Sequence, residues 1–379
     1  MAELYPIATG IVTQGGNCYW GPNTIYFDPD TGSSVNTNEM VEILWREGDF
    51  YYIRYQVGNT GNYKRAYYQC SKITITTGTV TTHTPPVAPG NYRYVCEGAA
   101  TYYDPISMTS AGSLALIETI RLVGATIGDY ELVEYDVNNS EDGKRRRAWF
   151  NKNKLNAMPV YNHTLYAHSG YTGSELPVAE QDWNALYIFH YLTNIGFTVE
   201  AACAVLGNIK QECKMNPGGW EVTSNGQPDT VRGYGLMQWT PATDYLKRAK
   251  QDGIISATTD ASAATAVNAL ADGDRYAIEK LMQSQLECML WGFLAGNRWG
   301  NPANYNADNH TNITMTIYQF MNSTLDIRTL TVIFHDHYER SKDYDDVFGT
   351  DVGITFDPEK QGKLSCRVRF AEEFYEKFL

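Results

Sequence analysis

The apolar residues of this chain follow two different periods, and the change between them falls between residues 157 and 181. Before this point, short runs rich in Tyr, Ile and Val alternate with Gly, Asn and Asp turns, as in residues 49–62, which predicts β-strands. After it, apolar residues recur at helical spacing, which predicts amphipathic helices. Because 379 residues also exceed one ordinary core, we expect a multidomain chain in which all-β domains precede a mainly α domain.

The β region contains a diverged internal repeat. Residues 49–57 are echoed by residues 129–137, and the Lys-Arg-Ala-Tyr-Tyr run at 64–68 is echoed by Arg-Arg-Ala-Trp-Phe at 146–150. Two copies of one unit predict two small β-barrels. The Thr/Pro-rich stretch between them lacks a helical period and indicates a linker. We place the first barrel at residues 1–75, a linker at 76–90, the second barrel at 91–156, a second linker at 157–181 and the helical domain at 182–379.

Five sets of apolar residues at helical spacing outline the helical region. Thr198 is a suitable N-cap for the second of these helices. Such stripes are expected to face a common core. They comprise Trp183, Leu186, Tyr187, His190 and Tyr191, then Ala202, Val205, Leu206, Ile209 and Cys213, then Ile278, Leu281, Met282, Met289, Leu290 and Phe293, then Leu330, Phe334, His337 and Tyr338, and finally Cys366, Phe370, Phe374 and Phe378.

The net charge and the cysteine content limit which partners and which cellular compartment are expected for this chain. The formal net charge of −13 argues against nucleic acid or an anionic membrane as the main partner, since basic patches bind both. No apolar run reaches the length of a membrane-spanning helix, and the first residues lack the pattern of a secretory signal. The seven cysteines are odd in number and form no CxxC pair, which is typical of folding in a reducing cytosol. A protein of this kind that acts outside the cell must leave by lysis or inside a particle.

The stretch at residues 207–219 carries the clearest chemical signal. It places Glu212 in the last turn of a predicted helix, beside the apolar stripe and just before Asn-Pro-Gly-Gly. Partial burial and the helix dipole both favour the protonated carboxyl there. A protonated carboxyl is what a glycosidic oxygen needs from a general acid. Position alone also allows a solvated glutamate at a frayed helix end.

A second segment favours the catalytic interpretation. The Glu-x-x-x-Asn-Pro pattern at Glu212, followed by Gly-Leu-Met-Gln at 235–238, resembles the paired signature of goose-type lysozymes and soluble lytic transglycosylases. The resemblance implies that Glu212 is the catalytic acid and that Gln238 and the backbone at Gly235 contact the saccharide. The usual serine after the glutamate is Cys213 here, a departure that bears on the transglycosylase comparison most.

Further motifs resemble the phage tail-lysin family over most of residues 182–379. They are Trp-Thr at 239–240, Gln-Leu-Glu-Cys-Met-Leu-Trp at 285–291 and Phe-x-x-x-Tyr-Glu-Arg at 334–340. This resemblance implies a lysozyme-like domain on a phage tail tip, made in the host cytoplasm and in contact with other tail proteins. Its substrate would be bacterial peptidoglycan, cut at the β-1,4 bond between N-acetylmuramic acid and N-acetylglucosamine. Tyr338 would approach the cleft, unless it is a core aromatic.

The Arg-Ala-Tyr and Arg-Ala-Trp signatures of the repeat resemble bacterial Src-homology-3-type barrels, over residues 8–75 and 92–156. Such barrels are similar to the wall-binding modules of many peptidoglycan hydrolases. The resemblance implies that this region binds the wall, and docking onto a tail is the alternative.

Other site residues follow from position. Glu221 and Asp229, in the loop between the two motifs, are candidates for a second carboxylate, although related enzymes also work with one. Trp220 and Trp239 lie beside the motifs and are candidate sugar-stacking faces. His335 and His337 point to different sides of a helix and cannot ligate together as an i, i+4 pair can. We therefore expect no metal and no cofactor.

Two alternatives remain open at this level. One is a free endolysin with the same chemistry, and the other is a structural tail-tip protein whose lysozyme-like domain is inactive. The presence of both Glu212 and Gln238 favours an active enzyme. The choice between a hydrolase and a lytic transglycosylase is not made by these motifs.

Overall fold

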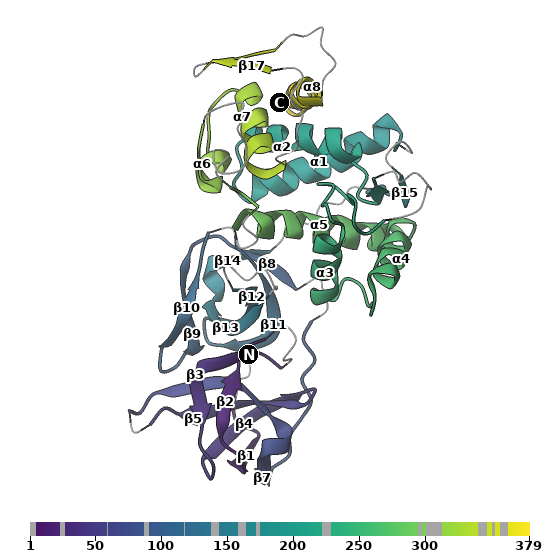
Figure 1. Cartoon of the computed structure of the whole chain (residues 1–379). Helices are drawn as coiled ribbons and strands as arrows, with labels where there is room; N and C mark the ends of the chain where they lie inside the picture. The colour runs from purple at the N-terminus through teal and green to yellow at the C-terminus, as the bar shows by residue number, and fades with distance from the viewer. Residues whose placement is uncertain are drawn as a thin grey trace. The chain divides into compact units, whose positions relative to one another are not determined.

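The chain forms two compact units, Met1–Met158 and Pro159–Leu379 (Figure 1). The first is all β and the second is mainly α, which confirms the architecture predicted from the change of period. The computed structural model describes residues 5–22, 27–58, 60–86, 91–116, 118–137, 144–157, 164–171, 175–221, 229–294, 298–300, 313–339, 347–350, 353–356 and 363–379.

The N-terminal unit contains two seven-stranded antiparallel sheets with the same strand order. The first sheet runs β3-β2-β6-β5-β4-β1-β7, and the second runs β10-β9-β13-β12-β11-β8-β14. Each strand of the first sheet therefore has a counterpart in the second, which supports the internal repeat. The first sheet comprises β1 (Ala8–Val12), β2 (Gly16–Tyr19), β3 (Pro29–Val35), β4 (Met40–Glu47), β5 (Phe50–Gln56), β6 (Tyr63–Gln69) and β7 (Ile73–Gly78). The second comprises β8 (Tyr92–Val95), β9 (Ala99–Asp104), β10 (Thr109–Leu114), β11 (Thr119–Ile127), β12 (Tyr130–Asp136), β13 (Arg145–Asn151) and β14 (Leu155–Ala157).

The central strands of both sheets are buried on both faces. In β5, Tyr51 and Ile53 face the core of the first sheet, whereas Tyr52 faces a separate cluster. That cluster also contains Leu132 of β12 and Trp149 of β13, so both sheets contribute to it. Successive side chains of a strand point to opposite faces, and one strand can therefore serve two cores.

Buried polar contacts also join the two sheets. The indole nitrogen of Trp149 donates to the Tyr52 hydroxyl at 2.9 Å. An ion pair of 2.7 Å joins Arg147 and Glu47, and another of 3.0 Å joins Arg65 and Asp104. These contacts satisfy polar groups that would otherwise be costly to bury.

The segment predicted to be the first linker is partly structured. Strand β7 extends to Gly78, and the amide of His83 donates to the carbonyl of Arg46 at 2.8 Å. The His83 ring contacts the carbonyl of Val123 at 2.7 Å, so this segment contacts both sheets. The Thr/Pro-rich composition does not report such long-range contacts. Residues 87–90 lie outside the described part of the chain.

The C-terminal unit is built around α5, whose residues 281–290 are all buried. Helix α2 packs against α7 and α8 (Figure 1). The helices are α1 (Val178–Asn194), α2 (Val199–Cys213), α3 (Thr243–Gln251), α4 (Asp260–Ala271), α5 (Arg275–Leu294), α6 (Ile317–Met321), α7 (Ile327–Phe334), the π-helix η4 (His335–Glu339) and α8 (Lys363–Phe378). Short strand pairs are β15 (Gly170–Tyr171) with β16 (Gly219–Trp220), and β17 (Val347–Thr350) with β18 (Gly353–Phe356). No helix in the described ranges is long and apolar enough to span a membrane.

Residues of the predicted second linker belong to this unit. Leu165 and Leu176 are buried, and the amide of Tyr166 donates to the Asn184 side chain at 3.0 Å. The amide of Ser169 donates to Asp272 at 2.7 Å. The Gly/Ser/Asn/Pro punctuation indicates irregular backbone, but it does not exclude packing. Residues 158–163 and 172–174 are not among those described.

Helix α2 has the buried face that the sequence predicts, whereas the buried faces of α1 and α8 differ from the prediction in part. Thr198 caps α2 by accepting from the Ala201 amide, and every residue of the predicted stripe is buried. Trp183 of α1, predicted to face the core, is 44% exposed. In α8 the predicted stripe holds only in part: Phe374 is buried, whereas Cys366, Phe370 and Phe378 are partly exposed. The buried face comprises Leu364, Arg367, Val368, Ala371 and Phe374.

Candidate active site

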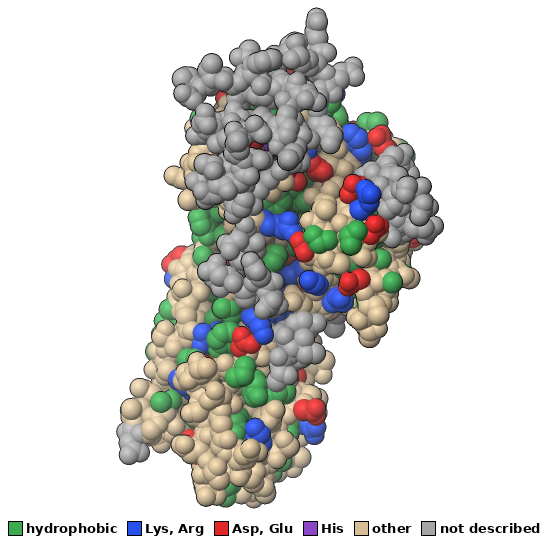
Figure 2. Space-filling view, in the orientation of Figure 1, with side chains coloured by type: hydrophobic (Ala, Val, Ile, Leu, Met, Phe, Trp, Pro, Cys, Tyr) green, Lys and Arg blue, Asp and Glu red, His purple; other side chains and the backbone are tan. Residues whose placement is uncertain are grey.

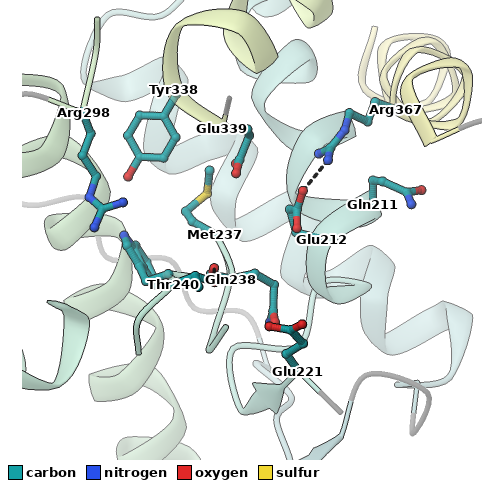
Figure 3. Close-up of a pocket in the computed structure, with 11 residues that line it drawn as sticks. Gln211, Glu212, Glu221, Met237, Gln238, Thr240, Arg298, Tyr338, Glu339 and Arg367 are labelled. Carbon is teal, nitrogen blue, oxygen red and sulfur yellow. Dashed lines mark hydrogen bonds and ion pairs between the residues drawn. The ribbon is translucent and has the colours of Figure 1, made fainter. Parts of the chain in front are cut away.

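A pocket of about 570 Å³ opens in the C-terminal unit and contains five of the eight predicted site residues (Figure 3). Its walls come from the end of α2, the segment 237–240, η4 and α8. Acidic, basic and apolar side chains are intermixed on the face of this unit seen in Figure 2. The lining residues are Gln211, Glu212, Glu221, Met237, Gln238, Trp239, Thr240, Arg298, Tyr338, Glu339 and Arg367.

Glu212 lies on the pocket wall in the last turn of α2, with 19% of its side chain exposed. The helix ends directly after it, because Lys214 adopts the left-handed conformation at φ 52°. This end places a carboxyl at the rim of a packed helix rather than on a solvated face. The structure therefore agrees with the predicted position of Glu212.

Arg367 contacts Glu212 through one guanidinium nitrogen and Oε1 (Figure 3). The arginine side chain is only 2% exposed, and it also donates to the Asn208 side-chain oxygen at 3.3 Å. Asn208 in turn donates to the carbonyls of Ala204 and Thr331, at 2.9 and 3.1 Å. A network across α2, α7 and α8 thus fixes Glu212. The Arg367 guanidinium stabilises negative charge on the oxygen that it contacts. The sequence argument considered only burial and the helix dipole, and it missed this cation.

Two backbone carbonyls hold the side chain of Gln238, the last residue of the Gly-Leu-Met-Gln segment, in place. Its amide nitrogen donates to the carbonyls of Gly219 and Gly235, at 3.1 and 2.9 Å. Gly235 does not line the pocket but has a structural reason to be glycine: its φ is 75°, and a Cβ there would lie 2.6 Å from Oε1 of Gln285. That glutamine joins the two motifs, because it accepts from the Leu236 amide and donates to the Pro217 carbonyl.

Trp239 and Tyr338 form the apolar part of the pocket. The Trp239 ring stacks on Tyr245 with centroids 5.3 Å apart and is itself almost fully buried. Burial raises the pKa of Tyr338 well above its ordinary value, so its phenol is neutral and is not a base at physiological pH. Arg298, which forms an ion pair with Asp244, lies beside Tyr338 (Figure 3).

The predicted second carboxylates differ in position. Glu221 lines the pocket and is anchored to its loop, accepting from the Gly233 amide at 2.9 Å and from Arg232 at 3.3 Å. Asp229 is outside the described pocket wall and accepts from the Val231 amide. Trp220 is 1% exposed, and its indole nitrogen donates to Asn268 at 2.8 Å. The structure therefore gives Trp220 a packing role rather than an open sugar-stacking face.

Sequence reasoning missed three charged residues of the pocket: Arg298, Glu339 and Arg367. Glu339 lies inside the Phe-x-x-x-Tyr-Glu-Arg motif, which was a usable signal, whereas Arg340 of that motif is not described. Arg367 is marked only by its spacing from Leu364 and Ala371 on α8.

Cys213, the residue after Glu212, is not activated as a thiol nucleophile. Burial, and then the Glu212 carboxylate, raises the pKa of the Cys213 thiol well above its ordinary value, so the thiolate needed for a nucleophile is disfavoured. Within the described ranges, no cluster of three His, Cys, Asp or Glu side chains has the arrangement of a metal site.

Comparison with known proteins identifies the family of the chain. Residues 183–378 match the family described as phage tail lysozyme. The chain belongs to this family. A relative, morphogenesis protein 1 of Bacillus phage B103, is 33% identical over 165 residues, which cover 44% of this chain and 36% of the relative. The chain thus spans little more than a third of that protein's length.

Proposed function

We propose that this protein is a phage tail-associated peptidoglycan hydrolase that cuts the glycan strand. Its bond is the β-1,4 linkage between N-acetylmuramic acid and N-acetylglucosamine. The observation that carries the proposal is the position of Glu212, partly buried on the wall of a pocket that also holds the fixed amide of Gln238. Family membership supports the tail location and a lysozyme-like activity.

Glu212 acts as the general acid in this proposal. Oε1 of Glu212 accepts a hydrogen bond from Arg367, so Oε2 is the oxygen that donates the proton to the glycosidic oxygen. Arg367 then stabilises the carboxylate left after proton transfer, in a site where little water screens the charge. Gln238, Trp239 and Tyr338 line the pocket that receives the saccharide, and Gly235 shapes the loop that carries Gln238.

The N-terminal unit has a targeting role in the proposal. It binds either the cell wall or other tail proteins, and it thereby holds the catalytic unit at its substrate. The protein would act from the tip of the virion tail during penetration of the wall.

Replacement of Glu212 by Gln tests the assignment. The amide keeps the shape of the side chain and removes the proton donor, so release of soluble glycan fragments from purified walls should fall by about 10²–10⁴-fold. Mass spectrometry of the released fragments measures this. Glu279→Gln, on α5 outside the pocket, is the matched control and should leave the rate unchanged. A Glu212→Gln variant that released fragments at the wild-type rate would refute the acid role.

A further inference from the structure

Glu339 lines the same pocket as Glu212 but comes from a different element. It is the last residue of η4, which continues α7, whereas Glu212 lies in the last turn of α2. In Figure 3 both side chains extend into the pocket, with Met237 beside them. The side chain is partly buried, and its Oε1 atom is shielded from solvent.

Glu339 is the last residue of a π-helical turn, and both Tyr338 and Glu339 line the pocket. A π-turn inserts an extra residue into a helix, and such turns are frequent at functional sites. Helix α7 ends at Phe334, and the next five residues form this wider turn.

Buried side chains hold the turn in place. The two ring nitrogens of His337 contact the carbonyls of Gly300 and Ile313, at 2.6 and 3.1 Å. The His337 ring also stacks on Trp299, with centroids 4.8 Å apart. Glu339 therefore projects from a fixed support, as catalytic groups require.

Glu339 and Glu212 line one pocket, and Glu339 also acts on the residue that follows Glu212. Cys213, the neighbour of Glu212, is affected by both carboxylates: after burial and Glu212, the charge of Glu339 also raises the pKa of this thiol. Glu221, the other acidic residue of the pocket, is nearly half exposed and is committed to Gly233 and Arg232 in its own loop. Of the two, Glu339 is the carboxylate on the rigid, less solvated wall.

We propose that Glu339 is the second carboxylate of the reaction and takes a proton from the attacking water. The inference rests on the proposed function. Glu212 gives its proton to the leaving oxygen as the C1–O4 bond breaks, the water oxygen bonds to C1, and Glu339 accepts one proton from that water. Solvent then returns the proton to Glu212. The products are a reducing N-acetylmuramic acid end and a free 4-hydroxyl, so the chain is a hydrolase and not a transglycosylase.

The test compares Glu339→Ala and Glu339→Gln with Glu221→Gln on purified peptidoglycan. Loss of a general base predicts a fall of about 10²–10⁴-fold for both Glu339 variants, while Glu221→Gln should keep most of the activity. Azide or formate should restore Glu339→Ala, because a small anion can occupy the space of the carboxylate, and should not restore Glu339→Gln. Glu339→Gln is isosteric and should unfold at the wild-type temperature.

Product analysis completes the test. The wild type should release reducing-end fragments, and mass spectrometry distinguishes them from anhydro ends made by internal attack. The inference is overturned if Glu339→Ala stays within about tenfold of the wild type, if neither anion restores it, or if the wild type yields anhydro ends. A wild type that releases no glycan fragments would instead refute the proposed function itself.

Discussion

Buried ion pairs fix individual side chains in both units. In the C-terminal unit Arg367 meets Glu212, and in the N-terminal unit Glu134 meets Arg147 at 2.8 Å, Arg121 at 3.0 Å and Arg145 at 3.2 Å. Burying a charge is costly unless it is paired, so loss of one partner costs more than the pair contributes. The same kind of contact thus stabilises the packing of one unit and fixes a carboxyl on the pocket wall of the other.

Glu134 gives a prediction on pH. Burial opposes its ionisation, but Arg147, Arg121 and Arg145 together outweigh burial and lower its pKa from 4.5 to about 2. A depressed folded pKa stabilises the fold above the unfolded value, and this stabilisation is lost as pH falls through the folded value. The unfolding free energy of residues 1–158 should therefore decline between about pH 4.5 and pH 2.

Urea unfolding of the 1–158 fragment measures this decline. Glu134→Gln should lower the unfolding free energy at pH 7 by on the order of 3 kcal/mol and should flatten the acid dependence. Glu131→Gln on the same strand is the control: burial raises the pKa of Glu131, so its pH dependence has the opposite sign. An acid profile unchanged by Glu134→Gln would contradict the assignment.

The sequence predicted some site residues and missed others for a physical reason. Glu212 and Gln238 lie in two short motifs that Gln285 joins through the Leu236 amide and the Pro217 carbonyl. Local patterns could therefore identify them. Arg367 meets Glu212 from 155 positions further along the chain. Only the packing of α8 on α2 brings the two together, and no local pattern encodes that approach.

At the scale of elements, the closeness of α2 and α8 depends on Gly207. A Cβ on this residue would lie 2.3 Å from the carbonyl oxygen of Arg367 and 2.7 Å from the Ala371 side chain. Helix backbones can approach this closely only where a side chain is missing. Gly207 therefore sets how closely α8 packs on α2, and this spacing determines where Arg367 enters the pocket.

Gly207→Ala should destabilise the C-terminal unit, although alanine normally favours a helix interior by about 0.5–1 kcal/mol. The added methyl group meets backbone, so a net loss of about 1–3 kcal/mol is expected, together with slower glycan cleavage because Arg367 moves. Thermal unfolding and fragment release are the measurements. Thr265→Ala, at an exposed position of α4, gains helix propensity without a clash and should not destabilise. A more stable Gly207→Ala variant would show that the helices can separate at no cost.

Strand β5 shows what an element-level pattern could have added. Its Phe50-Tyr51-Tyr52-Ile53 run lacks alternation between apolar and polar residues, which is typical of strands covered on both faces. This run predicts a second covering layer, but it does not say which segment provides it. The structure identifies the layer as the second sheet, through Leu132 and Trp149.

At the scale of the molecule, the two units have separate interiors. The clusters of the N-terminal unit draw on residues 8–150, and the core around α5 draws on the helices after residue 178. The predicted linker at 157–181 contains two buried leucines among polar punctuation, so packing and composition divide the chain at different residues. The compact C-terminal unit begins at Pro159.

Truncation tests this boundary and the role of the N-terminal unit together. The fragment 159–379 should fold and release glycan fragments from dispersed walls at the rate of the full chain, since all described residues that line the pocket lie within it. The fragment 182–379 loses Leu165, Leu176 and the Ser169–Asp272 contact. Burial of two leucines stabilises by about 3–6 kcal/mol as an upper estimate, so this shorter fragment should unfold at a clearly lower temperature. Equal unfolding temperatures of the two fragments would show that residues 159–181 do not stabilise the unit, and the boundary would then lie at residue 182.

Intact cell walls separate targeting from catalysis. If the N-terminal unit binds the wall, fragment 159–379 should be slower than the full chain on intact walls while matching it on dispersed material, because local concentration no longer assists it. Equal rates on both substrates would exclude wall binding and leave docking onto the tail as the role of the two sheets. Sedimentation of the separate 1–158 fragment with purified walls gives an independent measurement, since binding does not depend on Glu212. A fragment 159–379 that folds but cleaves neither substrate would show that the catalytic unit needs the N-terminal unit for activity, contrary to the separate interiors.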